Sequence, residues 1–218
     1  MQFVMKIEAV LFDMDGTLVD SEGTHHRALS DVLDGLGLAK PAGFDAAMTG
    51  QSLRAVYEHL VAEAGLPLSY AELATAKYRA FLDRIGELHW RPGAQQALAA
   101  VAEAGCAFAV VTNSDRMLLD ASLKVLGLTR PDLITVSRND VREGKPQPEP
   151  YLRAAWLLSL TPAQCLVVED SQAGATAGLA AGMTVIGWPE ASRPDMSFGA
   201  GALVAPPHDL ARLLAGLL

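Results

Sequence analysis

The sequence predicts an α/β protein with a Rossmann-like parallel sheet, helices on both faces of the sheet, and an inserted all-α domain. Three observations lead to this fold class. From residue 92 onward, apolar runs typical of buried strands alternate with amphipathic helical patterns. A further strand-like run stands alone near the N-terminus, and a long segment with only helical patterns separates it from the rest. Strands that alternate with helices form βαβ units with a parallel sheet.

The first strand is the apolar run at residues 7–12, which is broken only by Glu8 and is typical of a buried central strand. It stops at Asp13 and Asp15, and Gly16 follows them directly. Open α/β folds bind ligands at the carboxyl edge of the sheet, so this strand brings two carboxylates to a candidate site. Gly16 permits a turn that would let both carboxylates serve one site.

The segment of residues 20–90 carries helical patterns and no strand pattern. Apolar residues at helical spacing predict a helix at 22–37 and another after Ser52. Ser69 with Glu72 three residues later predicts a capping box at the start of a helix that extends to about residue 88.

These patterns divide the chain into two predicted domains. We expect a catalytic core of residues 1–18 and 92–218, and a helical cap of residues 19–91. The cap leaves the core just after the two aspartates, so it could close over a substrate as a lid and exclude water.

The second part of the core shows regular alternation. The patterns predict helices at 94–104, 116–126, 150–158, 173–181 and 209–217, and strands at 106–112, 134–136, 166–169 and 184–188. The two cysteines, Cys106 and Cys165, each begin an apolar run and are interpreted as small core residues without metal or redox spacing.

Composition limits the classes of partner. Of 218 residues, 50% are hydrophobic and 19% are charged, which suits a globular protein with a substantial core. The formal net charge of −8 argues against nucleic acid or an anionic membrane as the main partner. No signal peptide and no apolar run long enough for a membrane span is evident, so a cytoplasmic location is expected.

Hydrogen-bond donors follow the predicted strand at 106–112. Thr112, Asn113 and Ser114 come at its end, at the same sheet edge as Asp13. Donors there suit the oxygens of a phosphoryl group in transfer. Thr and Ser at strand ends are also common helix caps, and we expect Ser114 or its neighbour Asp115 to cap the next helix.

One lysine stands out from the solvent-exposed majority. Lys145 lies between Gly144 and Pro146, in a loop whose prolines stiffen it and begin a helix. A rigid loop that holds one ammonium group is suited to binding phosphate.

The strand at 166–169 also ends in acids, Glu169 and Asp170. Asp170 could be a helix cap. Together with the two aspartates after the first strand, however, these carboxylates would repel one another unless a cation joined them. Ligation by oxygen alone, with room for phosphate and water, indicates Mg²⁺.

The motifs resemble those of the haloacid dehalogenase-like hydrolases, in the branch with helical caps that contains phosphoglycolate phosphatase, other small-molecule phosphatases and β-phosphoglucomutase. Asp-Met-Asp-Gly-Thr-Leu-Val-Asp-Ser from residue 13 resembles the first motif, and the Thr-Asn pair from residue 112 the second. Gly-Lys-Pro-x-Pro-x-x-Tyr from residue 144 resembles the third, and Glu-Asp-Ser-x-x-Gly from residue 169 the fourth. The four motifs occur in the family's order and span most of the chain.

The resemblance implies a role for each core residue. Asp13 would be the nucleophile that forms an aspartyl phosphate, and Asp15 the general acid and base. Lys145 would bridge Asp13 and the phosphoryl oxygens, and Thr112 and Asn113 would bind the phosphoryl group.

The same resemblance implies the metal ligands. Mg²⁺ would be held by an Asp13 carboxylate oxygen, the Asp15 backbone carbonyl and Asp170, with Glu169 in close support.

The function that this implies is a Mg²⁺-dependent phosphatase acting on a small phosphorylated metabolite, such as a sugar or sugar-alcohol monoester. Asp15 disfavours the dehalogenase branch, which lacks an acid/base at that position. One alternative is a phosphosugar mutase of the β-phosphoglucomutase type, and a second is a non-catalytic binding protein on the same fold.

Residues of the predicted cap bear on these alternatives. His25 matches a histidine near the hinge of the mutase, although it could be an exposed helix residue. Thr49 and Gly50 match the family's substrate-specificity loop. The mutase carries basic residues around this loop, whereas this chain has Thr49 and Leu53 there, with the nearest cation, Arg54, one residue out of register. This departure weakens the mutase interpretation.

The predicted cap has two lysines, Lys40 and Lys77. Neither lies in a recognisable context for the Schiff-base lysine of a phosphonatase, and we expect both to face solvent. The expected partner is therefore a small phosphorylated metabolite. We expect the chain to be a monomer or a weak homodimer.

Overall fold

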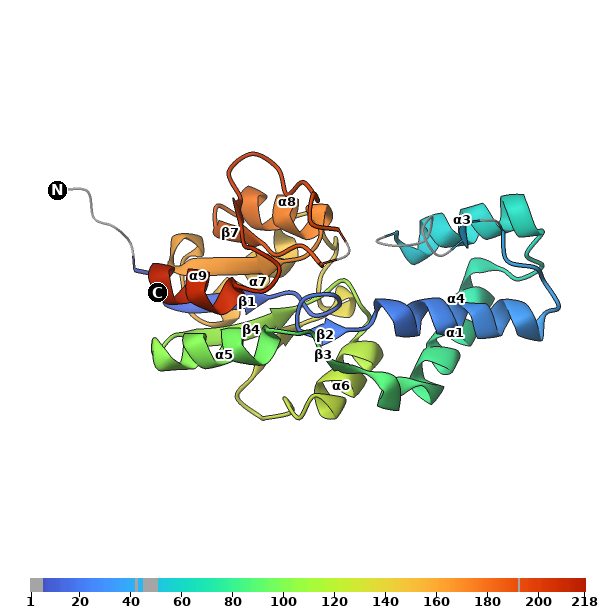
Figure 1. Cartoon of the computed structure of the whole chain (residues 1–218), viewed down its shortest axis with the longest axis horizontal. Helices are drawn as coiled ribbons and strands as arrows, with labels where there is room; N and C mark the ends of the chain where they lie inside the picture. Colours follow the sequence, from blue (N-terminus) through green and yellow to red (C-terminus); the bar gives the residue numbers. More distant parts are fainter. Residues whose placement is uncertain (1–5, 42, 45–50, 192) are drawn as a thin grey trace. The chain divides into compact units, whose positions relative to one another are not determined.

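Two compact units make up the chain (Figure 1), one formed by Met1–Asp20 with His89–Leu218 and the other by Ser21–Leu88. The computed structural model describes residues 6–41, 43–44, 51–191 and 193–218. We call the first unit the sheet unit and the second the helical unit. No helix among the described residues has both the length and the apolar character needed to cross a lipid bilayer.

The sheet unit is built on a six-stranded sheet with the order β5-β4-β1-β6-β7-β8, in which all neighbours are parallel. Its strands are β1 (Ala9–Phe12), β4 (Ala107–Val111), β5 (Ile134–Val136), β6 (Cys165–Glu169), β7 (Thr184–Gly187) and β8 (Leu203–Val204). Every residue of β1 is fully buried, as expected of a strand with neighbours on both sides and helices on both faces.

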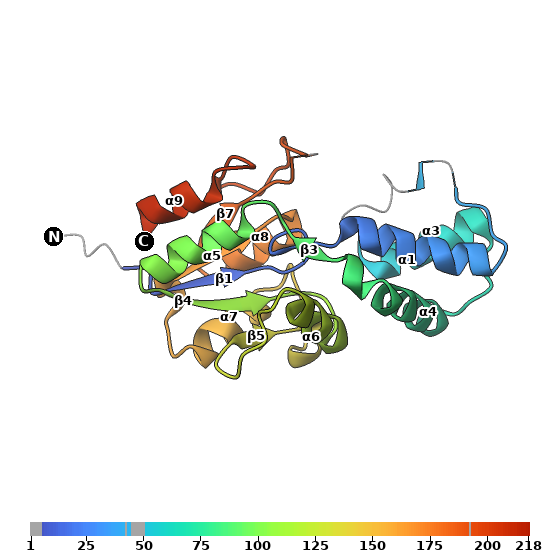
Figure 2. The same ribbon diagram turned by 60° about the horizontal axis from the view of Figure 1, so that its bottom comes forward.

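Helices cover the two faces of this sheet (Figure 2). They are α5 (Ala94–Glu103), α6 (Arg116–Val125), α7 (Glu149–Leu157), α8 (Gln172–Ala180) and α9 (Leu210–Leu217). α5 packs against α9, while α7 packs against α8 and against strands β4 and β5. The predicted α/β class with a parallel sheet is confirmed.

Short antiparallel strands, β2 (Val19–Asp20) and β3 (His89–Trp90), pair with each other in the sheet unit, just before and just after the helical segment in the sequence. The expectation that residues 20–90 contain no strand was therefore wrong at both ends of that range. Strands of two residues are too short to show an alternating pattern in the sequence. β8 was missed for the same reason.

The helical unit contains α1 (Glu22–Gly35), α3 (Leu53–Ala64), α4 (Tyr70–Asp83) and a 3₁₀ turn at Ile85–Glu87. Buried apolar side chains from these helices form one cluster, with Leu33, Leu60 and Leu73 fully buried. This cluster gives the unit its own hydrophobic core, so the helices do not depend on helix propensity alone.

The predicted helix starts of this unit are confirmed. Ser52 accepts a hydrogen bond from the Ala55 amide, and Ser69 and Glu72 form the reciprocal capping box. The predicted end near residue 88 was too late, because α4 stops at Asp83 and a 3₁₀ turn follows.

An acidic side chain in the sheet unit provides a test of stability. Asp140 accepts hydrogen bonds from the Ser137 amide (2.7 Å) and hydroxyl (2.6 Å) and from Arg116 at the start of α6. Burial alone would raise the pKa of Asp140, but these hydrogen bonds outweigh it and lower the pKa below its ordinary 3.8. The ionised Asp140 carboxylate therefore stabilises the folded state at pH values above 3.8, and this stabilisation is lost as the pH falls through the lowered pKa.

We expect Asp140→Asn to lower the free energy of unfolding by about 1 kcal/mol at pH 7, measured by urea denaturation. The difference from wild type should stay constant down to about pH 5 and shrink below about pH 4, where Asp140 takes up a proton. Asp120→Asn is the matched control, because Asp120 also contacts Arg116, at 3.5 Å, but is largely exposed. An equal loss in both variants would contradict this account.

Candidate active site

The first strand ends at the turn that begins with Asp13. The Asp13 amide donates to the Val168 carbonyl (3.0 Å), which continues the β1–β6 pairing by one residue. The Met14 carbonyl then accepts from the amides of Leu18 (2.9 Å) and Val19 (3.0 Å), which closes a tight turn. Gly16 adopts a φ of +77° within it, so the turn predicted at this glycine is confirmed.

Asp15 faces the end of the neighbouring strand β4. Its carboxylate accepts a hydrogen bond from the Ser114 hydroxyl (2.6 Å) and a longer one from the Thr112 hydroxyl (3.5 Å). The Thr112 oxygen in turn accepts from the Ser114 amide (3.0 Å). These two hydroxyl groups therefore hold the Asp15 carboxylate, which the family resemblance predicts to be the general acid and base.

The sequence predicted Ser114 as a donor at the sheet edge or as a helix cap, but not as the partner of Asp15. Asp115, not Ser114, holds the N-cap position of α6, and neither side chain makes a capping hydrogen bond there. The Arg116 amide in the first turn donates instead to the Asn139 side chain (2.7 Å). The pattern Thr-Asn-Ser contained the signal, but a contact across 99 residues to Asp15 cannot be read from local spacing.

Lys145 is buried among acceptors from three strands. Its ammonium group donates to Asp13 (2.5 Å), to Glu169 (2.5 Å) and to the Val111 carbonyl (2.8 Å). All three ammonium protons are thus directed at oxygen atoms. This lysine joins the ends of β1, β4 and β6.

Asn113 holds the backbone of Lys145. Its amide oxygen accepts from the Lys145 amide (2.9 Å), and its amide nitrogen donates to the Lys145 carbonyl (3.0 Å). A Cβ on Gly144 would lie 2.5 Å from the same amide oxygen, so the loop can approach only with glycine there. The side chain of Asn113 is therefore directed at the lysine loop, while its predicted contact with substrate stays a prediction.

Glu169 is fully buried, and both of its oxygens have partners. One accepts from Lys145 and from the Tyr151 hydroxyl (2.6 Å). The other accepts from the Ser171 hydroxyl (2.9 Å) and amide (3.3 Å). A Cβ on Gly174 would lie 1.7 Å from this carboxylate, so the start of α8 can pass it only with glycine at that position.

Asp170 contacts the turn after β1. It accepts a hydrogen bond from the Thr17 hydroxyl (3.2 Å), and a Cβ on Gly16 would lie 2.3 Å from its carboxylate. Oxygen atoms of Asp13, Glu169 and Asp170 all lie within 4.8 Å of one another, an arrangement that could hold a metal ion. Because the oxygens of Glu169 already bind other groups, Asp13 and Asp170 are the better available ligands.

The electrostatics of the cluster agree with a cation site. Burial, together with repulsion from Glu169 and Asp170, raises the pKa of Asp13 well above its ordinary value despite Lys145. Burial and Glu169 raise the pKa of Asp170 to about 7. Burial alone would lower the pKa of Lys145, but Asp13 and Glu169 outweigh it and raise the pKa. The cluster thus carries an excess of buried acids over its one lysine.

The cap residues that the family resemblance predicts to contact substrate belong to the helical unit. His25 lies in α1 and stacks on Phe81, with ring centroids 4.3 Å apart. Thr49 and Gly50 lie outside the described residues. Arg54 places its guanidinium 3.9 Å from the centroid of the Tyr70 ring.

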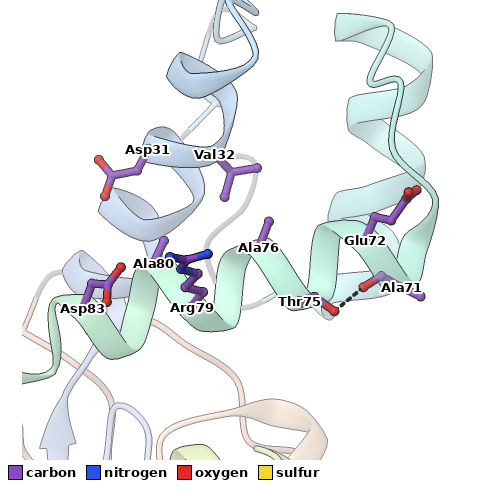
Figure 3. Close-up of a pocket in the computed structure, with 9 residues that line it drawn as sticks. All are labelled: Asp31, Val32, Ala71, Glu72, Thr75, Ala76, Arg79, Ala80 and Asp83. Atoms are coloured by element: carbon purple, nitrogen blue, oxygen red, sulfur yellow. Dashed lines mark hydrogen bonds between the residues drawn. The ribbon is translucent and has the colours of Figure 1, made fainter.

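A groove of about 570 Å³ between α1 and α4 lies within the helical unit (Figure 3). Several of its lining residues are alanines, and the Asp31 carboxylate there is already bound by Arg84 at 2.6 and 2.9 Å. Asp31, Glu72 and Asp83 also line the groove, but among the described residues only the acids at the sheet edge, Asp13, Glu169 and Asp170, bring three carboxylates close enough to hold a metal ion. The sheet edge is therefore the better candidate for chemistry.

The chain is similar to known proteins along most of its length. The model of the haloacid dehalogenase-like hydrolase family matches residues 10–188. Hexitol phosphatase A of Escherichia coli (strain K12) is 36% identical over 182 residues, which cover 84% of this chain and 83% of that protein.

Two solved structures extend the comparison. A HAD family hydrolase from Deinococcus radiodurans R1 with bound phosphate and sodium is 32% identical, with a TM-score of 0.76 and 98% of each chain covered. A variant of CbbY from Rhodobacter sphaeroides in complex with xylulose-1,5-bisphosphate is 25% identical, with a TM-score of 0.80 and coverage of 94% of this chain and 96% of that chain.

The packing around Glu169 provides a test. Gly174→Ala should push the Glu169 carboxylate away from Lys145 and lower the free energy of unfolding by about 1–3 kcal/mol, measured by urea denaturation. Gly35→Ala is the control, because a Cβ on this helical glycine meets nothing within 4 Å and should be neutral or slightly stabilising. Wild-type stability in the Gly174 variant would show that the carboxylate has room to move.

Proposed function

The chain belongs to the haloacid dehalogenase-like hydrolase family, and from this premise we propose that it is a Mg²⁺-dependent phosphatase of small phosphorylated metabolites, with a sugar or sugar-alcohol monoester as substrate. The observation that carries the proposal is the buried cluster at the sheet edge. Asp13, which accepts from Lys145 at 2.5 Å, lies in one turn with Asp15, which accepts from Ser114 at 2.6 Å.

The proposed chemistry divides the reaction into two displacements. An Asp13 oxygen attacks phosphorus, the bond from phosphorus to the alcohol oxygen breaks, and an aspartyl phosphate forms. Asp15 donates a proton to the leaving alcohol. Water then attacks the aspartyl phosphate, Asp15 accepts its proton, and inorganic phosphate leaves with Asp13 restored.

The surrounding groups prepare these two aspartates. Lys145 offsets the repulsion between the Asp13 carboxylate and an incoming phosphate monoester. Ser114 and Thr112 orient the Asp15 carboxylate, while Asn113 holds the lysine loop through its backbone. In this proposal Thr112 and Asn113 also contribute donors to the phosphoryl group.

The residues present fit a magnesium ion. Asp13 and Asp170 would supply carboxylate oxygens of the kind Mg²⁺ prefers, Glu169 would support the cluster through Lys145, and by the family resemblance the Asp15 backbone carbonyl would be a further ligand. The ion, when bound, stabilises negative charge on the transferring phosphoryl group.

The substrate class is supported by the relatives. One is named a hexitol phosphatase, and a structural relative was solved with xylulose-1,5-bisphosphate. We propose that residues 19–91 act as a cap that selects the substrate, with His25, Thr49 and Gly50 in contact with it. No nucleic acid or membrane partner is proposed.

A phosphosugar mutase is the second candidate, because a β-phosphoglucomutase-like protein of Thermotoga maritima shares the fold with a TM-score of 0.80. A mutase would use the same aspartyl phosphate and return the phosphoryl group to the sugar. It needs cations in the cap for a second phosphate. Arg54, the cation nearest to the predicted loop in the sequence, is one residue out of register with the basic residues of the mutase, which favours the phosphatase.

We expect wild-type protein to release phosphate from at least one sugar or sugar-alcohol monoester in a panel, and Asp13→Asn to reduce this release by about 10³-fold or more because the nucleophile is lost. Asp34→Asn, an exposed acid of α1, is the matched control and should retain full activity. Conversion of β-glucose 1-phosphate to the 6-phosphate, with no phosphate release from any substrate, would overturn the phosphatase proposal in favour of the mutase.

Metal removal should abolish the reaction. Treatment with EDTA followed by desalting should reduce phosphate release to background, and added Mg²⁺ should restore it, while Na⁺ at the same ionic strength should not. Full activity after chelation would contradict the proposed metal dependence.

A further inference from the structure

A buried arginine, Arg91, lies just after the chain re-enters the sheet unit, and it contacts the turn that begins with Asp13. Arg91 directly follows β3, and the residue is only slightly exposed (6%). Its guanidinium donates to the carbonyls of Gly16 (2.5 Å), Trp188 (3.0 Å) and Pro189 (2.6 Å). A buried cation is costly without such partners, so these carbonyls compensate part of its lost hydration.

The Trp188 ring lies against the Arg91 guanidinium and fixes the orientation of that group. The guanidinium carbon lies 3.6 Å from the centroid of the Trp188 ring, and Trp188 is fully buried. The indole nitrogen donates to the Pro207 carbonyl (2.9 Å) and the Trp188 amide donates to the Glu169 carbonyl (2.6 Å). Arg91 is therefore stacked on a ring that is itself fastened to the end of β6.

The contact with Gly16 leads to the acidic cluster. Gly16 packs so closely on Asp170 that a Cβ there would lie 2.3 Å from the carboxylate oxygen. The next residue, Thr17, donates to the same carboxylate. The Arg91 amide also donates to the Leu18 carbonyl (3.0 Å), so both the backbone and the side chain of Arg91 hold this turn.

We propose that Arg91 is a positioning residue, which holds the Gly16 carbonyl and thereby fixes the turn after Asp15 against Asp170. The inference rests on the proposed function, because it assigns Arg91 to the metal site of the same reaction. Arg91 contacts neither the acidic carboxylates through a hydrogen bond nor the proposed nucleophile; it acts through the backbone of the turn.

Two substitutions distinguish loss of the hydrogen bonds that hold the turn from loss of the positive charge of Arg91. Arg91→Met keeps an apolar chain that can pack on Trp188 but removes all donors to the carbonyls. Arg91→Lys keeps the charge and an ammonium group but lacks the planar guanidinium fork that reaches three oxygens. Arg130→Met is the control, because Arg130 also lies over an aromatic ring, 4.8 Å from the centroid of Phe108, and is about half exposed (48%).

The first measurement is titration of metal-free protein with Mg²⁺ in a calorimeter. We expect Arg91→Met to weaken Mg²⁺ binding by about 10-fold or more, as is typical when a group that orients metal ligands is removed. Arg91→Lys should recover part of this loss, and Arg130→Met should bind Mg²⁺ like wild type. Simple loss of a positive charge beside the acids would instead tighten Mg²⁺ binding. Tighter or unchanged binding in Arg91→Met would overturn the proposal.

Steady-state kinetics provide the second measurement. With Mg²⁺ saturating and the best monoester of the panel, Arg91→Met should lower kcat by about 10-fold and change KM by less than about 3-fold. A lower melting temperature with unchanged kcat and Mg²⁺ affinity would show a merely structural role and overturn the proposal. A change confined to KM would do the same.

The two measurements keep this inference separate from the proposed function. If wild-type protein binds Mg²⁺ but releases no phosphate from any monoester, the proposed phosphatase fails while the calorimetric comparison still decides the role of Arg91. If Arg91→Met does not fold, the comparison of Arg91→Lys with wild type decides it, with a weakening of Mg²⁺ binding of about 3-fold or more expected because the fork is lost.

Discussion

The site depends on one buried ammonium group shared between two carboxylates. Lys145 donates to both Asp13 and Glu169 at 2.5 Å, where burial strips all three groups of most of their hydration. Removing charges from water costs several kcal/mol each unless excellent geometry and further hydrogen bonds compensate. The Val111 carbonyl supplies such a bond to the lysine, and Tyr151 supplies another to Glu169. The ends of three strands must therefore stay in register for the cluster to exist.

The backbone approaches polar side chains of the site so closely at three motif positions that only glycine fits there. A Cβ would lie 2.3 Å from Asp170 at Gly16, 2.5 Å from the Asn113 oxygen at Gly144, and 1.7 Å from Glu169 at Gly174. Each glycine belongs to a different segment, so the segments converge on the cluster with only hydrogen atoms between backbone and side chain. This packing shields the acids from most of the surrounding water and strengthens the electrostatic interactions among them.

The acids at strand ends could be predicted from the sequence, because the carboxyl ends of parallel strands meet at one edge. This rule brings Asp13, Glu169 and Asp170 together, and the rigid loop around Lys145 points to the lysine. No such rule finds Arg91, whose partners lie 75 to 98 residues away, because no local pattern relates an arginine to distant carbonyl groups. The sequence did not predict strands β2, β3 and β8 for a similar reason. Pairing with a neighbouring strand stabilises them, and their own composition does not.

The proposed function places the chemistry in the sheet unit and the choice of substrate in the helical unit. In this proposal the aspartyl phosphate forms with residues of the sheet unit alone, so a phosphatase and a mutase would share that half of the reaction. They differ in what accepts the phosphoryl group, which is water in one and a sugar hydroxyl in the other. A sugar that carries a second phosphate needs a cation to hold it in place while it reorients. Arg54 is the cation nearest to the predicted specificity loop in the sequence, and it is one residue out of register with the basic residues of the mutase. The charges of the predicted specificity loop therefore favour water as the acceptor.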